Sequence, residues 1–340
     1  MSMSMRVLVT GGAGFIGSHV VDRLLALRNE VVVLDDLSSG NRANISAHIE
    51  RDDANFQFHR VDIRNDEIED FFKGIEEVWH LAANPEVRIG VEDTRVHLEQ
   101  NVIATYNVLE AMRRRGVKRI VFTSTSTVYG EATVLPTPEE YPTIPISLYG
   151  ASKLACEALI ASYCHTFGMH SWIYRFANVI GRRASHGVIY DFINKIMRNP
   201  DELEILGDGN QTKSYIYIDD CIDAMFAGFE DTDTDTDTDA DADANAKRVH
   251  IFNIGTNDMI SVRRIAEIVC TEMHASPEFK FTGGRRGWTG DVPVMLLDAT
   301  KLRKLGWKQR YNSEEAVRKA TKDLLAYSQF QCLQSEGDGE

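Results

Sequence analysis

The chain has 340 residues, of which 43% are hydrophobic, and this is enough apolar material for one large domain or two smaller ones. Its formal net charge of −14 disfavours nucleic acid and anionic membranes, because both carry negative charge themselves. No apolar run approaches the roughly 20 residues that a membrane-spanning helix needs. We therefore expect no nucleic-acid partner and no membrane partner.

The cysteines indicate a reducing compartment. They are five in number and none stands in Cys-x-x-Cys spacing, which argues against a disulfide framework and against a structural zinc site. The short leader before the first apolar run has neither a basic n-region nor a separate apolar region, so we expect no signal peptide. These features predict a cytoplasmic protein without a metal site.

An acidic tract interrupts the second half of the chain. Seven aspartates lie between Asp231 and Asp243, alternating with Thr or Ala. The tract has nothing to bury, which predicts a disordered, solvated loop over residues 230–246. Calcium binding is the weaker interpretation, because an EF-hand loop needs a central Gly and a terminal Glu that the tract lacks.

The residues after Met5 predict a strand, a glycine turn and a helix. The apolar run 6–10 leads directly into Gly11, Gly12, Gly14 and Gly17, and apolar residues then recur at helical spacing. Glycines 12, 14 and 17 satisfy G-x-G-x-x-G, and glycines 11, 14 and 17 satisfy the wider G-x-x-G-x-x-G. Such glycines allow a pyrophosphate to approach the backbone at a helix N-terminus, where amides and the helix dipole favour anions. An ordinary tight turn is the alternative.

Asp35 places a carboxylate where the adenosine ribose of a dinucleotide would lie. The next predicted strand, 30–34, ends in Asp35, 18 residues beyond Gly17. A carboxylate there accepts hydrogen bonds from an adenosine ribose and repels a 2′-phosphate, which favours NAD over NADP. Asp36 is positioned to share this role.

Strands and helices continue to alternate after this unit. Further strands are expected at 56–61, 77–81, 119–122 and 172–176. We expect an α/β fold: a Rossmann-type doubly wound parallel sheet with a smaller, interleaved C-terminal substrate domain. The NAD-binding domain is assigned to 1–176, with about 214–256 returning to it; the substrate domain is assigned to 177–213 and 257–330, and a tail to 331–340.

Several polar residues follow the predicted strands. Asp62 is either an adenine contact or a turn former, and Asn101, on a predicted helix, is either solvated or an internal brace. Five hydroxyl residues, 123–127, follow another strand and lead into Val128-Tyr129-Gly130. About 23 residues after Thr127, Tyr149 and Lys153 stand four apart at the start of a predicted helix, and so share one face. A nearby lysine cation favours the phenolate that a tyrosine base needs.

Four ordered motifs carry a family resemblance: 11–17, 81–83, 123–130 and Tyr149-Gly150-Ala151-Ser152-Lys153. Together they resemble the extended short-chain dehydrogenase/reductase superfamily of nucleotide-sugar enzymes, and within it the compact, archaeal-type UDP-glucose 4-epimerases. The similarity runs from about residue 5 to residue 328, apart from the acidic tract. It implies NAD as cofactor, a UDP-sugar as substrate and a homodimer, formed through helices around 94–114 and 150–166.

The resemblance also implies catalytic and cofactor-binding residues. Tyr149 would remove the proton of the sugar 4-hydroxyl as hydride leaves C4 for the nicotinamide, Lys153 would stabilise the phenolate and contact the nicotinamide ribose, and Thr125 would stand in for the usual serine at the sugar oxygen. The 4-keto sugar would then turn over and take the hydride back on its other face. The implied cofactor contacts are Gly11, Gly14, Phe15, Ile16, Gly17, Asp35, Asp36, Ser39, Gly40, Asp62, Ile63, Leu81, Ala82, Ala83, Asn101, Thr123, Tyr149, Lys153 and Phe176.

The two residues directly before Val128 narrow the range of reactions that the resemblance implies. Related dehydratases carry an Asp-Glu pair there and decarboxylases typically a Glu, whereas this chain has Ser126 and Thr127. Without that acid pair, elimination of water is disfavoured and plain epimerisation is favoured.

The C-terminal half supplies the implied substrate contacts. Lys213 stands where relatives often have an arginine that binds the substrate phosphates. Many relatives have a second arginine at the position of Trp288, and here we expect Arg286 to bind the diphosphate in its place. Asp291 either binds a uridine ribose hydroxyl or caps a turn. The full set is Arg88, Thr125, Ser126, Thr127, Tyr149, Asn178, Arg182, His186, Val188, Lys213, Arg286 and Asp291.

The expected function is NAD-dependent 4-epimerisation of UDP-glucose and UDP-galactose. UDP-glucuronate is the first alternative, because Arg88 or the pair Arg182-Arg183 offers a cation for a 6-carboxylate; a UDP-N-acetylhexosamine is another. A non-catalytic NAD-binding sensor and a net dehydrogenase are more distant alternatives.

Overall fold

A seven-stranded parallel sheet forms the centre of the molecule. It is seen in a computed structural model that describes residues 4–51, 53–64, 66–233 and 248–337. The strand order is β11-β6-β5-β4-β1-β2-β3, so the chain starts in the middle of the sheet and winds outward in both directions. The bounds are β1 Arg6–Thr10, β2 Glu30–Asp35, β3 Phe56–Arg60, β4 Glu77–His80, β5 Arg119–Thr125, β6 His170–Phe176 and β11 Val249–Ile254. This is the predicted Rossmann-type sheet.

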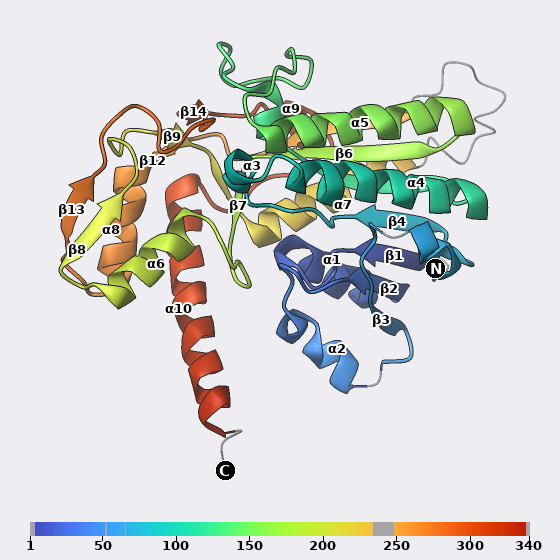
Figure 1. The fold of residues 1–340 in the computed structure, drawn as a ribbon, viewed down its shortest axis with the longest axis horizontal. Coiled ribbons are helices and arrows are strands. Elements are labelled where there is room, and N and C mark those ends of the chain that lie inside the picture. Colours follow the sequence, from blue (N-terminus) through green and yellow to red (C-terminus); the bar gives the residue numbers. More distant parts are fainter. Residues whose placement is uncertain (1–3, 52, 65, 234–247, 338–340) are drawn as a thin grey trace.

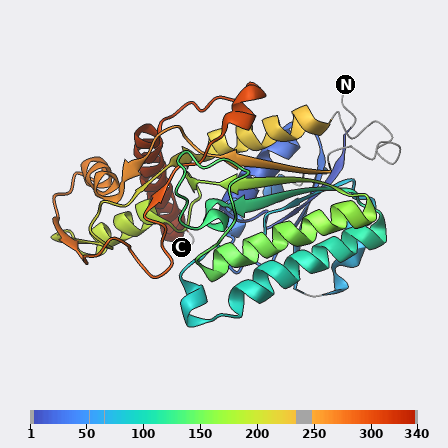
Figure 2. The same ribbon diagram turned by 90° about the horizontal axis from the view of Figure 1, so that it is seen from above.

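Helices cover both faces of this sheet, as Figure 2 shows from above. On one face α1 (Phe15–Ala26) and α7 (Ile218–Asp233) pack together, and on the other lie α4 (Ala104–Arg115) and α5 (Leu148–Phe167). The central strands bury side chains on both faces, which is why they are continuous apolar runs rather than alternating ones. Two hydrophobic cores result, one under each helical layer.

A second region lies beyond the carboxyl ends of the strands, on the left in Figure 1. Its main elements are α6 (Val188–Arg198), α8 (Val262–Glu272), α10 (Ser313–Gly337) and a two-stranded sheet of β8 (Glu202–Ile205) and β13 (Glu278–Phe281). One hydrophobic cluster runs without a break from α1 and β1 through α7 into α6, α8 and α10. The second region is therefore packed onto the sheet region through a shared core.

Short elements join the two regions. Two small sheets pair β7 (Asn178–Ile180) with β10 (Tyr215–Tyr217), and β9 (Thr212–Lys213) with β12 (Ile260–Ser261) and β14 (Val294–Met295). The short helices are α2 (Ser46–Glu50), α3 (Ile89–Glu92) and α9 (Thr300–Lys304). The chain leaves the main sheet after β6 and returns through α7 and β11, which pairs with β6 over its whole length.

The structure differs from the sequence predictions at three places. The hydroxyl run does not simply follow its strand: β5 extends through Thr125, and residues 126–129 form a 3-10 helix. The first residues of the expected acidic loop, 230–233, belong to α7, and the rest of that loop, 234–246, lies outside the described residues. Residues 331–337 of the expected tail continue α10.

Within the described ranges, each helix is either too short or too polar to span a bilayer.

Candidate active site

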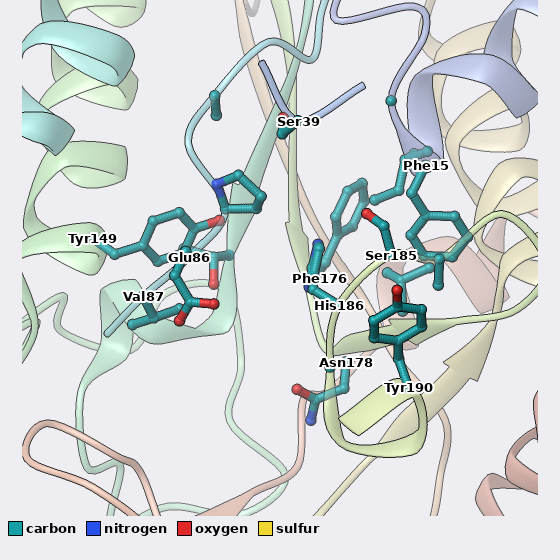
Figure 3. A pocket seen from close by; sticks show the side chains of 18 of the residues that line it. Phe15, Ser39, Glu86, Val87, Tyr149, Phe176, Asn178, Ser185, His186 and Tyr190 are labelled. Atoms are coloured by element: carbon teal, nitrogen blue, oxygen red, sulfur yellow. The ribbon is translucent and has the colours of Figure 1, made fainter. Parts of the chain in front are cut away.

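A cavity of about 830 Å³ opens where the sheet region meets the second region. Figure 3 shows its two walls, one bearing Tyr149, Glu86 and Val87, the other bearing Phe176, His186 and Tyr190. The first wall comes from the loop after β4 and from α5, and the second from β6 and the segment that leads into α6. The cavity therefore lies at the carboxyl ends of the strands, which is the expected ligand position in an open α/β sheet.

Most of the predicted site residues line this cavity. On the cofactor side they are Gly11, Gly14, Phe15, Ile16, Gly17, Asp35, Asp36, Ser39, Asp62, Ile63, Leu81, Ala82, Ala83, Thr123 and Phe176. Among the predicted substrate contacts they are Arg88, Thr125, Ser126, Thr127, Tyr149, Asn178, His186, Val188, Lys213 and Asp291, and Lys153, predicted as a catalytic and cofactor-binding residue, lines the cavity as well. Gly40, Asn101, Arg182 and Arg286 are not among the lining residues.

The glycine turn leaves room for a ligand against the backbone. A Cβ on Gly17 would stand 2.0 Å from the carbonyl oxygen of Gly11, and Gly11 itself has φ +70°, so side chains are excluded at both positions. Helix α1 starts at Phe15 behind Gly14, which has no side chain to cap the first amides. This arrangement fits the pyrophosphate of a dinucleotide, because uncapped amides at a helix N-terminus bind anions.

Asp35 stands at the end of β2 beside this turn. Its carboxylate accepts hydrogen bonds from the backbone N–H of Ala13 at 2.9 Å and of Leu37 at 2.8 Å. Burial raises the pKa of Asp35, and the two backbone hydrogen bonds oppose that shift. Asp35 therefore also braces the glycine turn, a role that the sequence pattern did not indicate.

Tyr149 and Lys153 lie in the first turns of α5. The hydroxyl of Ser147 caps this helix by accepting from the N–H of Gly150 at 3.1 Å, which fixes where the helix begins. The Lys153 Nζ donates to the carbonyl oxygen of Thr123 at 2.8 Å, so the buried lysine ties α5 to the end of β5. The helix and the strand thus present both side chains to the same cavity.

The pKa values do not follow the expected direction. Burial raises the pKa of Tyr149, and burial lowers the pKa of Lys153 to about 8. Lys153 is not among the groups that shift the pKa of Tyr149, because its ammonium donates to the carbonyl oxygen of Thr123 and burial has the largest effect on the tyrosine. Burial of Tyr149 therefore opposes the phenolate that the prediction requires.

Asn101 is an internal brace rather than a lining residue. It lies in a π-helical turn, Leu98–Ile103, just before α4. Its side-chain oxygen Oδ1 accepts from the N–H of Asn84 at 2.8 Å, and its side-chain amide donates to Ser152 Oγ at 2.9 Å. Ser152 in turn donates to the carbonyl of Tyr149, so Asn101 links the loop after β4 to α5.

Thr125 ends β5 and caps the 3-10 helix that follows. Its Oγ1 accepts from the N–H of Thr127 at 3.1 Å, and the two hydroxyls are also 3.1 Å apart. Both hydroxyls line the cavity on the same side as Tyr149. The strand end therefore offers adjacent hydroxyl groups to a bound sugar.

A buried polar chain supports these groups from below. Glu157, one turn after Lys153, accepts from Ser124 Oγ at 2.5 Å and pairs with Arg175 at 2.6 Å. Arg175 donates to the Tyr129 hydroxyl at 2.9 Å, which donates to Asn253 at 2.8 Å. The chain connects α5, β5, β6 and β11 directly under the cavity floor.

At the other end of the cavity, charged side chains are paired with one another. Lys213 Nζ lies 2.6 Å from the Asp291 carboxylate. Arg286 donates to the carbonyl of Asp291 and pairs with Glu131, so it braces the loop that carries Trp288. The expected replacement of a phosphate-binding arginine by Arg286 is not seen in this arrangement, and Trp288 itself lines the cavity.

The remaining predicted substrate contacts also divide into residues that line the cavity and residues that do not. The Asn178 amide donates to the carbonyl of Ser214 at 3.2 Å and still lines the cavity. Arg182 pairs with Asp219 at 2.8 Å and is not among the lining residues. The sequence analysis did not single out Glu86, Gln100 or Gln211, which also line the cavity; of these three only Glu86 carried a usable signal, since it lies between Ala83 and Arg88 after a strand end.

Comparison with known proteins shows which family this chain belongs to. Residues 7–255 match the model of the NAD dependent epimerase/dehydratase family. This chain belongs to that family. A putative UDP-glucose 4-epimerase from Methanocaldococcus jannaschii is 36% identical over 320 residues, covering 92% of this chain and 96% of the relative.

Solved structures of other epimerases have the same fold. A UDP-galactose 4-epimerase is similar with 43% identity and a TM-score of 0.83, over 95% of this chain and 99% of the other. A UDP-glucuronic acid 4-epimerase from Bacillus cereus, solved with UDP-glucuronic acid and NAD, is 28% identical with a TM-score of 0.81, over 95% and 100%. The cofactor of this epimerase/dehydratase family member is NAD, which agrees with the glycine cradle and the uncapped α1.

Proposed function

We propose that this protein is an NAD-dependent UDP-hexose 4-epimerase that interconverts UDP-glucose and UDP-galactose. The observation that carries the proposal is the meeting of Tyr149, Lys153 and Thr125 with the glycine cradle in one cavity. The similarity to a UDP-galactose 4-epimerase and to a putative UDP-glucose 4-epimerase supports the choice of sugar.

The proton chemistry is assigned to Tyr149. Its hydroxyl takes the proton of the sugar 4-hydroxyl and returns it after the ring has turned, acting first as base and then as acid. Bound NAD supplies a reversible hydride acceptor and a positively charged ring. The positive charge of the ring would favour the phenolate, whereas burial raises the pKa of Tyr149.

The neighbouring side chains position the sugar oxygen. Lys153, with a pKa of about 8, is mostly protonated at neutral pH, and its bond to Thr123 holds the charge beside the cofactor end of the cavity. The Thr125 hydroxyl donates a hydrogen bond to the reacting oxygen. Ser126 and Thr127 add hydroxyls where dehydration would need acids, so a 4-keto sugar is returned rather than dehydrated.

The test is whether the protein interconverts the two sugars without free NAD in the assay. UDP-galactose is incubated with the purified protein reconstituted with NAD, and the anomeric proton signals are followed by NMR. We expect UDP-glucose to accumulate to equilibrium with no steady rise in NADH absorbance. Formation of stoichiometric NADH, or turnover confined to UDP-glucuronate, would refute the proposal.

We also propose a homodimer formed through α4 and α5, which lie side by side on the outside of the sheet (Figures 1 and 2). Leu98, Ile103 and Tyr106 are 53%, 43% and 45% exposed at the start of this helical layer, and Phe167 is exposed at the end of α5. Such a set of apolar side chains is favourable to cover. Analytical ultracentrifugation should give a mass near twice 38.3 kDa, and a monomer at micromolar concentration would contradict the assignment.

A further inference from the structure

Glu86 places a carboxylate in the cavity beside the catalytic tyrosine. It belongs to the loop after β4, and Figure 3 shows it projecting from the same wall as Tyr149, with His186 on the opposite wall. Its backbone N–H donates to Asn84 Oδ1 at 2.9 Å, and Asn84 is itself held by Asn101. The backbone under Glu86 is thus fixed by the same brace that holds the catalytic helix.

This carboxylate is ionised at neutral pH. Partial burial alone would raise the pKa of Glu86, but hydrogen bonds from the side chain and the backbone N–H of Arg88 reverse the shift, and the pKa is lowered below its ordinary value. The Arg88 Nε lies 3.1 Å from Glu86 Oε1. Glu86 therefore stands at the cavity as an ionised carboxylate that is paired with Arg88.

The three arginines that offered a cation for a sugar carboxylate are all engaged. Arg88 pairs with Glu86 itself, Arg182 pairs with Asp219 at 2.8 Å, and Arg183 pairs with Asp22 at 2.8 Å. Arg182 and Arg183 also do not belong to the lining set. Beside Tyr149 the cavity thus presents the Glu86–Arg88 ion pair, whereas a uronate-binding site needs an unpaired cation.

The chemistry of the sugar explains why this position matters. C4 is the reacting carbon, C5 is bonded to it, and C6 is bonded to C5, so the 6-substituent lies two bonds from the reacting carbon, and turning the ring over moves it from one side of the Tyr149 hydroxyl to the other. A hexose carries a hydroxymethyl group there, whose O–H can donate a hydrogen bond to a carboxylate. A hexuronate carries a second negative charge, which a nearby carboxylate repels.

We propose that Glu86 is a specificity-determining residue that admits UDP-sugars with a neutral 6-position and excludes UDP-hexuronates. This inference rests on the proposed function, because it assumes that a UDP-sugar occupies the cavity with C4 at Tyr149. It adds that the discrimination is electrostatic and comes from a single side chain on the loop after β4.

The test compares UDP-glucose with UDP-glucuronate in Glu86→Gln and in a matched control. Glu92→Gln makes the same change six residues later, at an exposed position in α3 that does not line the cavity. For Glu86→Gln we expect the ratio of kcat/KM for UDP-glucuronate over UDP-glucose to rise roughly tenfold or more. Glu92→Gln should leave this ratio within about twofold of the wild-type value.

A double variant separates repulsion from attraction. Glu86→Gln also releases Arg88, so Glu86→Gln with Arg88→Gln removes both charges. A gain in the ratio that survives in the double variant supports repulsion by Glu86, whereas a gain that disappears shows that the freed arginine binds the uronate and overturns the inference. An unchanged ratio in a Glu86→Gln protein that still epimerises UDP-glucose overturns it as well.

Binding provides a readout that does not depend on turnover. Calorimetric Kd values for the two UDP-sugars, measured with NAD-loaded protein, should show the same shift of the ratio in Glu86→Gln and in Glu86→Ser, which guards against a folding defect in one variant. If the wild type binds both sugars but epimerises neither, the proposed function fails and the Kd ratio still tests Glu86. If neither sugar binds, the proposal for Glu86 fails with the proposed function.

Discussion

The two ends of the cavity recognise their ligands by different means. At the cofactor end the groups are mostly backbone, and the essential features are missing side chains: a Cβ on Gly17 would stand 2.0 Å from the carbonyl oxygen of Gly11. At the predicted substrate end the groups include charged side chains that are held by a partner, as Lys213 is by Asp291. The cofactor end is therefore sensitive to volume, whereas the substrate end is sensitive to charge.

Tyr149→Phe acts at the junction of the two ends and should have the largest effect. Removal of the hydroxyl removes the proton acceptor without changing the shape of either end, so kcat should fall by about 10²–10⁴-fold while NAD content and UDP-sugar Kd stay close to the wild type. Tyr106→Phe, at an exposed position on α4, is the control and should keep full activity. Near-wild-type turnover in Tyr149→Phe would remove Tyr149 from its assigned role.

Gly17→Ala tests whether the cofactor end depends on volume. The added methyl group forces the turn apart, and we expect NAD affinity to fall by roughly a hundredfold while UDP still binds. Gly116→Ala is the control, since Gly116 also lies in a tight turn, with φ +75°, but has nothing within 4 Å of an added Cβ. It should cost about 1 kcal/mol of stability at the end of α4 and leave NAD affinity unchanged. Equal NAD affinity in the two variants would contradict the inference that the glycine turn holds the pyrophosphate of NAD.

Lys213→Gln tests whether the substrate end depends on charge. The substitution removes a cation and leaves Asp291 without its 2.6 Å partner, so an anionic UDP-sugar should bind about tenfold more weakly while NAD affinity is preserved. Lys319→Gln, which breaks a pair with Asp323 on α10, serves as the control, since neither residue lines the cavity. A loss of NAD affinity in Lys213→Gln would show that the two ends are not separable.

The burial of His80 should make the folded protein less stable in acid. It ends β4 between the hydroxyls of Thr10 at 2.7 Å and Thr105 at 2.9 Å, and burial lowers its pKa from 6.5 to about 3. Below pH 6.5 the unfolded chain binds a proton that the folded protein does not, so stability falls as the pH drops from 6.5 towards 3, by at most about 1.4 kcal/mol per pH unit from this group.

Urea denaturation at pH 7 and pH 5 measures this loss. His80→Gln keeps a polar group between the two threonines and should reduce the difference between the two pH values. An unchanged difference would assign the acid sensitivity to other groups, such as His19, whose pKa burial also lowers, to about 4.

The cofactor end could be predicted from the sequence because its determinants are local. The strand, the glycines and the helix are consecutive, and the spacing alone places Gly14 and Gly17 at the helix start. The same holds for Tyr149 and Lys153, which share a helix face whatever surrounds them.

The substrate end could not be predicted to the same depth because its partners are distant in the chain. Arg183 pairs with Asp22, 161 residues away, and the Lys213 partner is 78 residues away. Spacing cannot show that an arginine is already neutralised, so Arg182 and Arg286 were expected in the site from their neighbours alone. Likewise, the raised pKa of Tyr149 comes from burial, which no sequence pattern reports.

The position of β11 has a consequence for how the protein is made. Six of the seven strands of the main sheet are complete once residue 176 has left the ribosome, but β11 begins only at Val249. Until then β6 is an open edge, and unpaired edges are where nascent chains aggregate or recruit chaperones. The late strand also delivers Asn253 to Tyr129, so the floor of the catalytic site is completed by a segment synthesised more than a hundred residues after the tyrosine that it holds.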